Sequence, residues 1–128
     1  MKKRTEITDA ERQIMAVLWQ QQPQTAREIC EALSEQTTWN PKTVHTLITR
    51  LHDKGMLERQ ADGRRFLYAT TISEEDFLSR RSRQFVRELF NGRLAPLVAC
   101  FAEKESLSKA DLEELRRVVD GLEADDES

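Results

Sequence analysis

The sequence predicts a mainly helical protein that carries one small β-hairpin, and three observations lead to this class. Apolar residues recur at helical spacing over most of the 128 residues. Most of these stretches begin at a Ser, Thr or Asn that suits a helix N-cap. Between residues 56 and 69 the period changes from 3.6 to 2 around an Asp-Gly pair, which is a strong hairpin signal. We expect one domain at 1–72, a three-helix domain at 73–124 and an acidic, frayed tail at 125–128.

The same capping motif predicts the start of each of the first two helices. Thr8 with Glu11, and Thr25 with Glu28, have the spacing of a capping box. The first helix closes before Pro23, since proline cannot continue it. The residues expected to face a core are Ile14, Met15, Val17, Leu18, Ala26, Ile29, Cys30 and Leu33.

A third helix begins at Asn40, followed by Pro41 at the position where proline is tolerated, and it stops at Gly55. Its apolar stripe consists of Val44, Leu47, Ile48 and Leu51. The opposite face carries Lys42, Thr43, His45, Thr46, Thr49 and Arg50. No carboxylate precedes Asp53 on this helix. A basic, hydroxyl-rich face suits DNA phosphates and base edges, and an ordinary solvated helix face is the alternative.

A hairpin is expected directly after this helix. The strand-like runs 56–60 and 65–69 flank a turn at 61–64. Arg64 and Arg65 lie at or beside the turn and Arg59 lies across from it, where they suit phosphate or minor-groove contact. Three capped helices and an arginine-tipped hairpin are typical of a winged helix-turn-helix, whose third helix reads DNA. In such a unit we also expect Thr25, at the start of the second helix, to contact DNA. The alternative is that the arginines only solubilise the turn.

The C-terminal half predicts a helical dimerisation domain behind the winged helix-turn-helix. Ser73 and Ser108 suit helix caps, and Asn91-Gly92 suits a helix end. Three short helices cannot bury their own apolar faces, so a symmetric dimer is expected, and packing back on the first domain is the alternative. The expected dimer contacts are Phe77, Phe85, Leu89, Leu94, Leu97, Val98, Phe101, Leu112, Leu115 and Val119.

The charge distribution is uneven. The net charge is −3, but residues 1–70 carry +2 and residues 71–128 carry −5, as in a nucleic-acid-binding head with an acidic body. No run of residues is apolar and long enough to span a membrane and no signal peptide is visible, so a cytoplasmic location is expected. Cys30 and Cys100 lie in apolar helical patterns and are expected to be buried small hydrophobes.

Catalytic and metal-binding functions find no support in the sequence. It has no Gly-rich phosphate loop, no Cys-x-x-Cys and no His-Glu-x-x-His. His45 and His52 are seven residues apart and lack a third ligand for a metal. We therefore expect neither an enzyme nor a protein with a cofactor. A protein-docking winged helix, and a regulator that responds to thiol oxidation or a metal, remain competing interpretations.

Several motifs make the chain resemble the penicillinase-repressor family of bacterial transcription regulators. They are Thr8 to Glu11 with Val17 to Trp19, the run Pro41 to Gly55, Asn91-Gly92 with Leu97, Val98 and Phe101, and the run Leu112 to Arg116. The resemblance covers residues 7–122. It implies a homodimeric winged-helix repressor on a palindromic DNA operator with TACA/TGTA-type elements, in which Lys42, Thr43 and Thr46 contact the major groove and Arg50 contacts phosphate.

Two departures from the family pattern concern specificity and release. His45 stands where penicillinase-type members tend to carry Arg. The β-lactam-responsive members are cleaved at an Asn-Phe bond, and the corresponding pair here is Cys100-Phe101. The resemblance thus makes this pair a candidate cleavage site and a membrane sensor metalloprotease a candidate partner. The copper-responsive branch has a C-terminal cysteine cluster, which this tail lacks.

Overall fold

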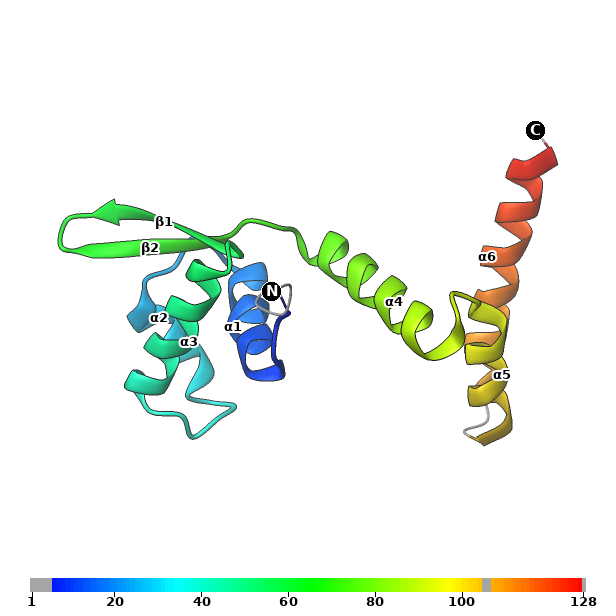
Figure 1. Ribbon diagram of the computed structural model, residues 1–128, viewed down its shortest axis with the longest axis horizontal. Coiled ribbons are helices and arrows are strands. Elements are labelled where there is room, and N and C mark those ends of the chain that lie inside the picture. The colour runs from blue at the N-terminus through cyan, green and yellow to red at the C-terminus, as the bar shows by residue number, and fades with distance from the viewer. Residues whose placement is uncertain (1–5, 105–106, 128) are drawn as a thin grey trace. The chain divides into compact units, whose positions relative to one another are not determined.

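The computed structural model describes residues 6–104 and 107–127 and divides the chain into two compact units, Met1–Ser79 and Arg80–Ser128 (Figure 1). Helix α4 runs through the division between them. In chain order the elements are α1 (Asp9–Gln20), α2 (Ala26–Leu33), α3 (Pro41–Asp53), β1 (Leu57–Asp62), β2 (Arg65–Thr70), α4 (Glu74–Phe90), α5 (Leu94–Lys104) and α6 (Lys109–Glu127). The mainly helical class with one hairpin is confirmed.

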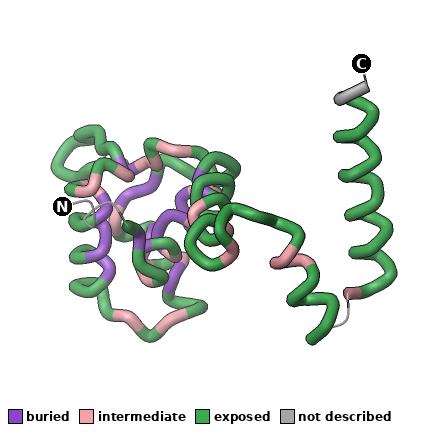
Figure 2. The backbone as a smooth tube through the Cα atoms, turned by 45° about the vertical axis from the view of Figure 1, so that its right-hand side comes forward, coloured by how far each residue is buried: buried purple, intermediate pink, exposed green. Residues whose placement is uncertain are grey.

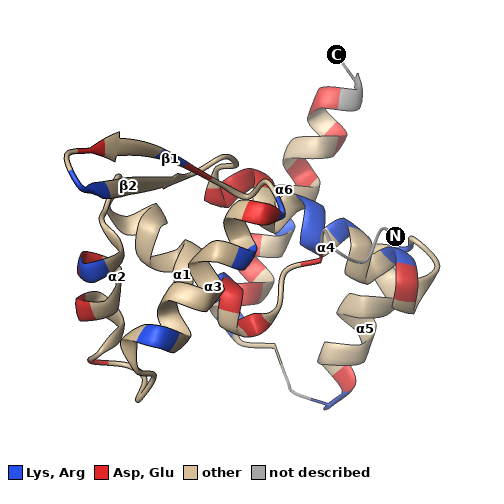
Figure 3. Ribbon diagram, turned by 60° about the vertical axis from the view of Figure 1, so that its left-hand side comes forward, with Lys and Arg blue, Asp and Glu red and all other residues tan. Residues whose placement is uncertain are grey.

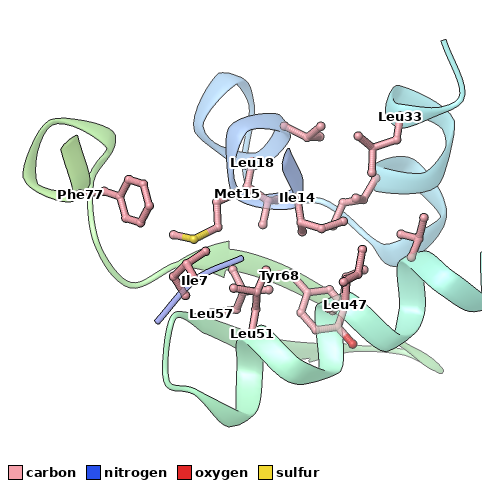
Figure 4. Packing of buried hydrophobic residues seen from close by; sticks show 14 residues of the cluster. Ile7, Ile14, Met15, Leu18, Leu33, Leu47, Leu51, Leu57, Tyr68 and Phe77 are labelled. Atoms are coloured by element: carbon pink, nitrogen blue, oxygen red, sulfur yellow. The ribbon is translucent and has the colours of Figure 1, made fainter. Parts of the chain in front are cut away.

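The first unit is built around one hydrophobic core. Helices α1, α2 and α3 contact one another, and both strands pack against them (Figure 4). The buried core residues are Ile7, Ile14, Met15, Val17, Leu18, Ile29, Leu33, Val44, Leu47, Ile48, Leu51, Leu57, Tyr68 and Phe77. Every apolar position expected to be central in the first three helices is therefore inside or against this core.

Local capping fixes where the helices begin. The Thr8 side chain accepts a hydrogen bond from the Glu11 backbone N–H, and Glu11 accepts one from the Thr8 N–H. Thr25 and Glu28 repeat this reciprocal pair. Each exchange satisfies two of the N–H groups that a helix start leaves without intrahelical partners. Both predicted capping boxes are confirmed.

The hairpin differs slightly from the expectation. Strands β1 and β2 pair antiparallel from Leu57 opposite Thr70 to Asp62 opposite Arg65, so only Gly63 and Arg64 form the turn. Gly63 has φ of +68°, and glycine at the first position of a two-residue loop is the pattern of a type II′ turn. The predicted turn at 61–64 was too long because strand pairing continues up to the glycine.

Phe77 does not lie where it was expected. Its side chain is 4% exposed and belongs to the core of the first unit, where its ring centroid lies 5.3 Å from that of Trp19. Trp19 also donates its indole N–H to the Ile72 carbonyl at 3.0 Å. Its role as a dimer contact is therefore wrong, because burial against Trp19 withdraws the ring from the surface.

The second unit exposes its apolar side chains. Purple buried segments are confined to the first unit in Figure 2, whereas the residues of 80–104 and 107–125 are exposed or only partly buried. Cys100 is exposed, so its expected burial was wrong; Cys30 is half-buried beside the first core. Helix α6 continues to Glu127, into the stretch expected to fray, since Ala and Glu favour helix and no Pro intervenes.

Candidate nucleic-acid interface

Helix α3 presents two chemically different faces. Val44, Leu47, Ile48 and Leu51 are buried in the core of the first unit. The side chains expected to read DNA, which are Lys42, Thr43, His45, Thr46, Thr49 and Arg50, are all exposed. The structure thus brings these six residues together on one surface, with a rigid core behind it.

Both ends of α3 are fixed by specific hydrogen bonds. The Asn40 side chain accepts from the Thr43 N–H at 2.9 Å, which confirms the predicted cap. At the other end the N–H of Met56 donates to the Leu51 carbonyl and that of Gly55 to the His52 carbonyl. This is a Schellman motif, and Gly55 occupies its left-handed position with φ of +80°. The helix therefore starts and stops at defined residues, which fixes the direction of its exposed side chains.

Five of the six exposed residues line a shallow hollow of about 330 Å³: Lys42, His45, Thr46, Thr49 and Arg50. Thr43 lies at the edge of this face, outside the hollow. Thr46 donates its hydroxyl to the Lys42 carbonyl at 3.0 Å, so its methyl group and oxygen have a defined orientation. The surface offers two cationic groups, two hydroxyls and an imidazole within two helical turns. Such groups can bind phosphate oxygens and the edges of bases.

A buried ion pair that the sequence reasoning missed holds the end of α3. Lys54 donates to the Glu11 carboxylate at 2.6 Å and to the Glu6 carbonyl at 2.8 Å. Glu11 is 1% exposed. Burial by itself raises the pKa of Glu11, but the hydrogen bond and charge of Lys54, together with the N–H of Thr8, outweigh it. The pKa of Glu11 therefore lies below its ordinary value. The pair joins residues 43 apart in sequence, and no local pattern predicts it.

The three predicted wing arginines have different surroundings. Arg59 stacks its guanidinium over the Phe66 ring at 4.2 Å from the centroid. Arg65 pairs with Asp62 at 3.2 Å. Arg64 lies in the turn itself, and it forms no ion pair among the residues that the structure describes. Arg64 is thus the wing side chain with the fewest competing contacts.

The Thr25 side chain is buried in the cap of α2. The residue is 5% exposed and its hydroxyl accepts from the Glu28 N–H in the capping box. The neighbouring Gln24 pairs its backbone with Tyr68 of β2 in both directions, at 3.0 and 2.8 Å. This bridge draws the start of α2 against the hairpin. The DNA contact expected of Thr25 stays a prediction, and the structure adds that its side chain is almost fully buried and already serves the cap.

The described parts of the chain were also compared with the requirements of a metal site and of a membrane span. Across residues 6–104 and 107–127, no three His, Cys, Asp or Glu side chains are grouped so as to hold a metal ion. No helix in these ranges is both apolar and long enough to cross a bilayer.

The family model for penicillinase repressors matches residues 7–121. The chain belongs to this family. Penicillinase repressors regulate transcription, so this member is a DNA-binding transcriptional repressor and not an enzyme.

Similar proteins cover nearly all of this penicillinase-repressor family member. Methicillin resistance regulatory protein MecI of Staphylococcus aureus is 38% identical over 114 residues, which are 89% of this chain and 93% of MecI. The penicillinase repressor of Bacillus licheniformis is 36% identical and covers 94% of both chains. The solved DNA-binding domain of the repressor BlaI is 41% identical, with a TM-score of 0.52, and covers 59% of this chain and 93% of that domain. The first unit is a winged helix-turn-helix of this kind.

Proposed function

We propose that two copies of this chain bind a palindromic operator and block transcription, with α3 in the major groove of each half-site. The observation that carries this proposal is the exposed face of α3, which is basic, rich in hydroxyls and free of carboxylates before Asp53. A relative supports it, since the first unit is similar to the solved DNA-binding domain of the repressor BlaI.

Within α3 the residues have separate tasks. Lys42, Thr43 and Thr46 contact base edges from the N-terminal half, the part of a recognition helix that enters the groove. Arg50 neutralises phosphate, and His45 sets the part of the preference by which this protein departs from its relatives. Arg64 at the wing adds a phosphate contact. Phosphate neutralisation supplies affinity and the base contacts supply discrimination.

Dimerisation is proposed from the uncovered apolar surface of the second unit. Of the predicted contacts, Phe85, Leu89, Leu94, Phe101, Leu112, Leu115 and Val119 are exposed. Leu97 and Val98 are half-buried in α5. Large apolar side chains exposed in this number are unusual for a monomer, so a second copy is the proposed cover. Two linked heads also gain affinity without any new DNA contact.

Release of the operator is proposed to follow loss of the dimer. Cys100 and Phe101 lie within α5 and are exposed in a single chain, so a protease such as a membrane sensor metalloprotease can approach them where the second copy leaves α5 uncovered. The bond between them is helical, so cleavage needs local opening of α5. A cut there separates α6 from the rest of the unit.

The reading face is tested with the double variant Lys42→Ala/Thr46→Ala. DNA fragments selected from a random pool by the wild-type chain define its operator. We expect the variant to lose preference for that operator over a scrambled duplex by at least about tenfold, since each good base contact contributes about 1–3 kcal/mol. Sedimentation should show an unchanged oligomeric state. Unchanged footprinting by the variant would remove α3 from the proposed interface.

A further inference from the structure

Helix α4 carries most of an arginine-rich segment that takes no part in the proposed DNA contacts of the first unit or in the proposed dimer contacts. Between residues 80 and 93 five arginines stand against one glutamate. Figure 3 shows this as blue along α4, in contrast to the many red carboxylates along α6. Residues 109–127 hold eight carboxylates and three basic residues. The acidic total of the C-terminal half therefore conceals a cationic segment at 80–93, although α4 as a whole balances four arginines with four carboxylates.

Three of these arginines share one side of α4. In a helix with 3.6 residues per turn, Arg80, Arg83 and Arg87 fall within about 60° of one another. We call them the arginine stripe. With Gln84 and Glu88 they line a shallow surface hollow of about 450 Å³. All three are exposed.

The arginine stripe lies opposite the apolar side of the same helix. Leu78, Phe85 and Leu89 are turned about 180° from it by helix geometry. A second copy that covers the apolar side therefore leaves the stripe facing solvent. Covering of the apolar side and binding at the stripe do not compete.

Two carboxylates lie beside the three arginines of the stripe. Glu88, the acidic residue in the hollow, accepts a hydrogen bond from Gln84 at 3.2 Å. Asp76 lies one turn before Arg80, and its backbone N–H is bonded to the Ser73 hydroxyl. In the part of the chain that the structure describes, neither Arg80 nor Arg87 forms an ion pair. Three arginines against these two carboxylates leave an excess of positive charge, and the planar, always-charged guanidinium groups match phosphate.

We propose that the arginine stripe is a second DNA-binding surface, which contacts the phosphate backbone and reads no bases. This proposal rests on the DNA-binding function of the family. From Arg80 to Arg87 the helix rises about 10 Å. One DNA strand carries a phosphate for about every 3.4 Å along the duplex axis, so a stripe parallel to that axis spans about three phosphates. The stripe thus has the length and charge to engage several adjacent phosphates. Such contacts raise affinity for any sequence and leave the preference between sequences to α3.

The test is the full-length triple variant R80Q/R83Q/R87Q, compared with a matched control, K109Q/R116Q/R117Q, which removes the same charge from α6. Affinity for a scrambled duplex and for the selected operator is measured by fluorescence anisotropy over a range of salt concentrations. We expect the slope of log affinity against log salt to fall by about 2–3 for each stripe engaged, at about 0.9 per lost phosphate contact. The ratio of operator to scrambled affinity stays unchanged, and the control keeps the wild-type slope.

Four outcomes would overturn the proposal. Equal slopes for the triple variant and the control mean that the stripe touches no phosphate. A weaker dimer in sedimentation with an unchanged slope assigns it to the acidic α6 of a second copy. Loss of binding to anionic lipid vesicles with an unchanged slope assigns it to a membrane surface. A changed operator-to-scrambled ratio means that it reads bases. If the wild-type chain itself binds no operator, the repressor function fails instead, which separates the two hypotheses. Circular dichroism checks that α4 stays folded.

Discussion

Glu11 and Lys54 form the contact that attaches the end of α3 to the start of α1. The carboxylate is almost fully buried and serves two partners, since it also accepts from the Thr8 N–H that begins α1. Glu11 therefore caps α1 and also neutralises the cation of Lys54, which follows the last residue of α3. Removing either partner leaves a buried group without its counter-charge, and this destabilises the fold more than replacing both partners would.

Lys54→Met should lower the free energy of unfolding by about 3 kcal/mol, at the low end for a buried pair because the ammonium keeps some contact with water. Urea denaturation measures the change. Lys109→Met on the exposed surface of α6 serves as the control and should stay within about 0.5 kcal/mol. The added effect of Glu11→Gln in the Lys54→Met background should be far smaller than in the wild type. Additive effects of the two changes would contradict the pairing.

The same pair predicts a pH dependence. In the wild type the pKa of Glu11 is lowered in the folded state, so its contribution is complete above the unfolded pKa. It is lost as pH falls through the folded pKa. In Lys54→Met, burial without a counter-charge should raise the pKa of Glu11, so acid should relieve the penalty. The gap in unfolding free energy between the two proteins should therefore narrow from pH 7 to about pH 4. A constant gap over this range would show that Glu11 does not titrate with the pair.

At the scale of elements, the starts and stops of helices followed from local sequence. Thr8, Asn40 and Gly55 were predicted in their capping roles, because a cap depends on residues within a few positions of itself. The exposed face of α3 followed from helical periodicity for the same reason. Contacts between distant residues did not follow. Phe77 on Trp19 and Lys54 on Glu11 join residues more than 40 positions apart, and nothing in either local stretch announces its partner.

The wing supplies a prediction about one arginine. Arg64→Ala should weaken binding to operator and scrambled duplex alike and reduce the salt slope by about 0.9 for each wing engaged, the value for one phosphate contact. Fluorescence anisotropy at several salt concentrations measures both quantities. Arg12→Ala, an exposed residue of α1, is the control and should leave the slope unchanged. A loss confined to the operator would instead make Arg64 a base-reading residue.

At the scale of the whole molecule, the core of the first unit is complete, and the apolar surface of the second unit is not covered by its own chain. Sequence patterning predicted this surface well, because the same helical spacing that marks a core marks an interface. The patterning did not predict which of these apolar residues would be buried in the core of the first unit. Phe77 was taken by the core, whereas Leu89 on the same helix remains 64% exposed.

Leu89→Glu should therefore break the dimer without unfolding the first unit. Sedimentation at micromolar concentration should give a monomer, and affinity for the palindrome should fall by about 10²-fold or more with the loss of linked binding. The near-ultraviolet signal of Trp19 reports the intact first core. Ala110→Glu, at an exposed position in the first turn of α6, adds the same charge and should remain dimeric. A dimeric Leu89→Glu protein would place the interface elsewhere.

The junction after α3 has a consequence for the operator itself. Only Lys54, Gly55 and Met56 separate the helix from β1, and the N–H groups of all three are bonded to carbonyls of α3. Because this connection is short and fully hydrogen-bonded, the hairpin keeps a fixed position relative to α3. The helix and the hairpin therefore keep a fixed distance from one another. In the proposed complex, operators can therefore differ in the bases that α3 contacts, but not in the spacing between those bases and the phosphate that the hairpin contacts.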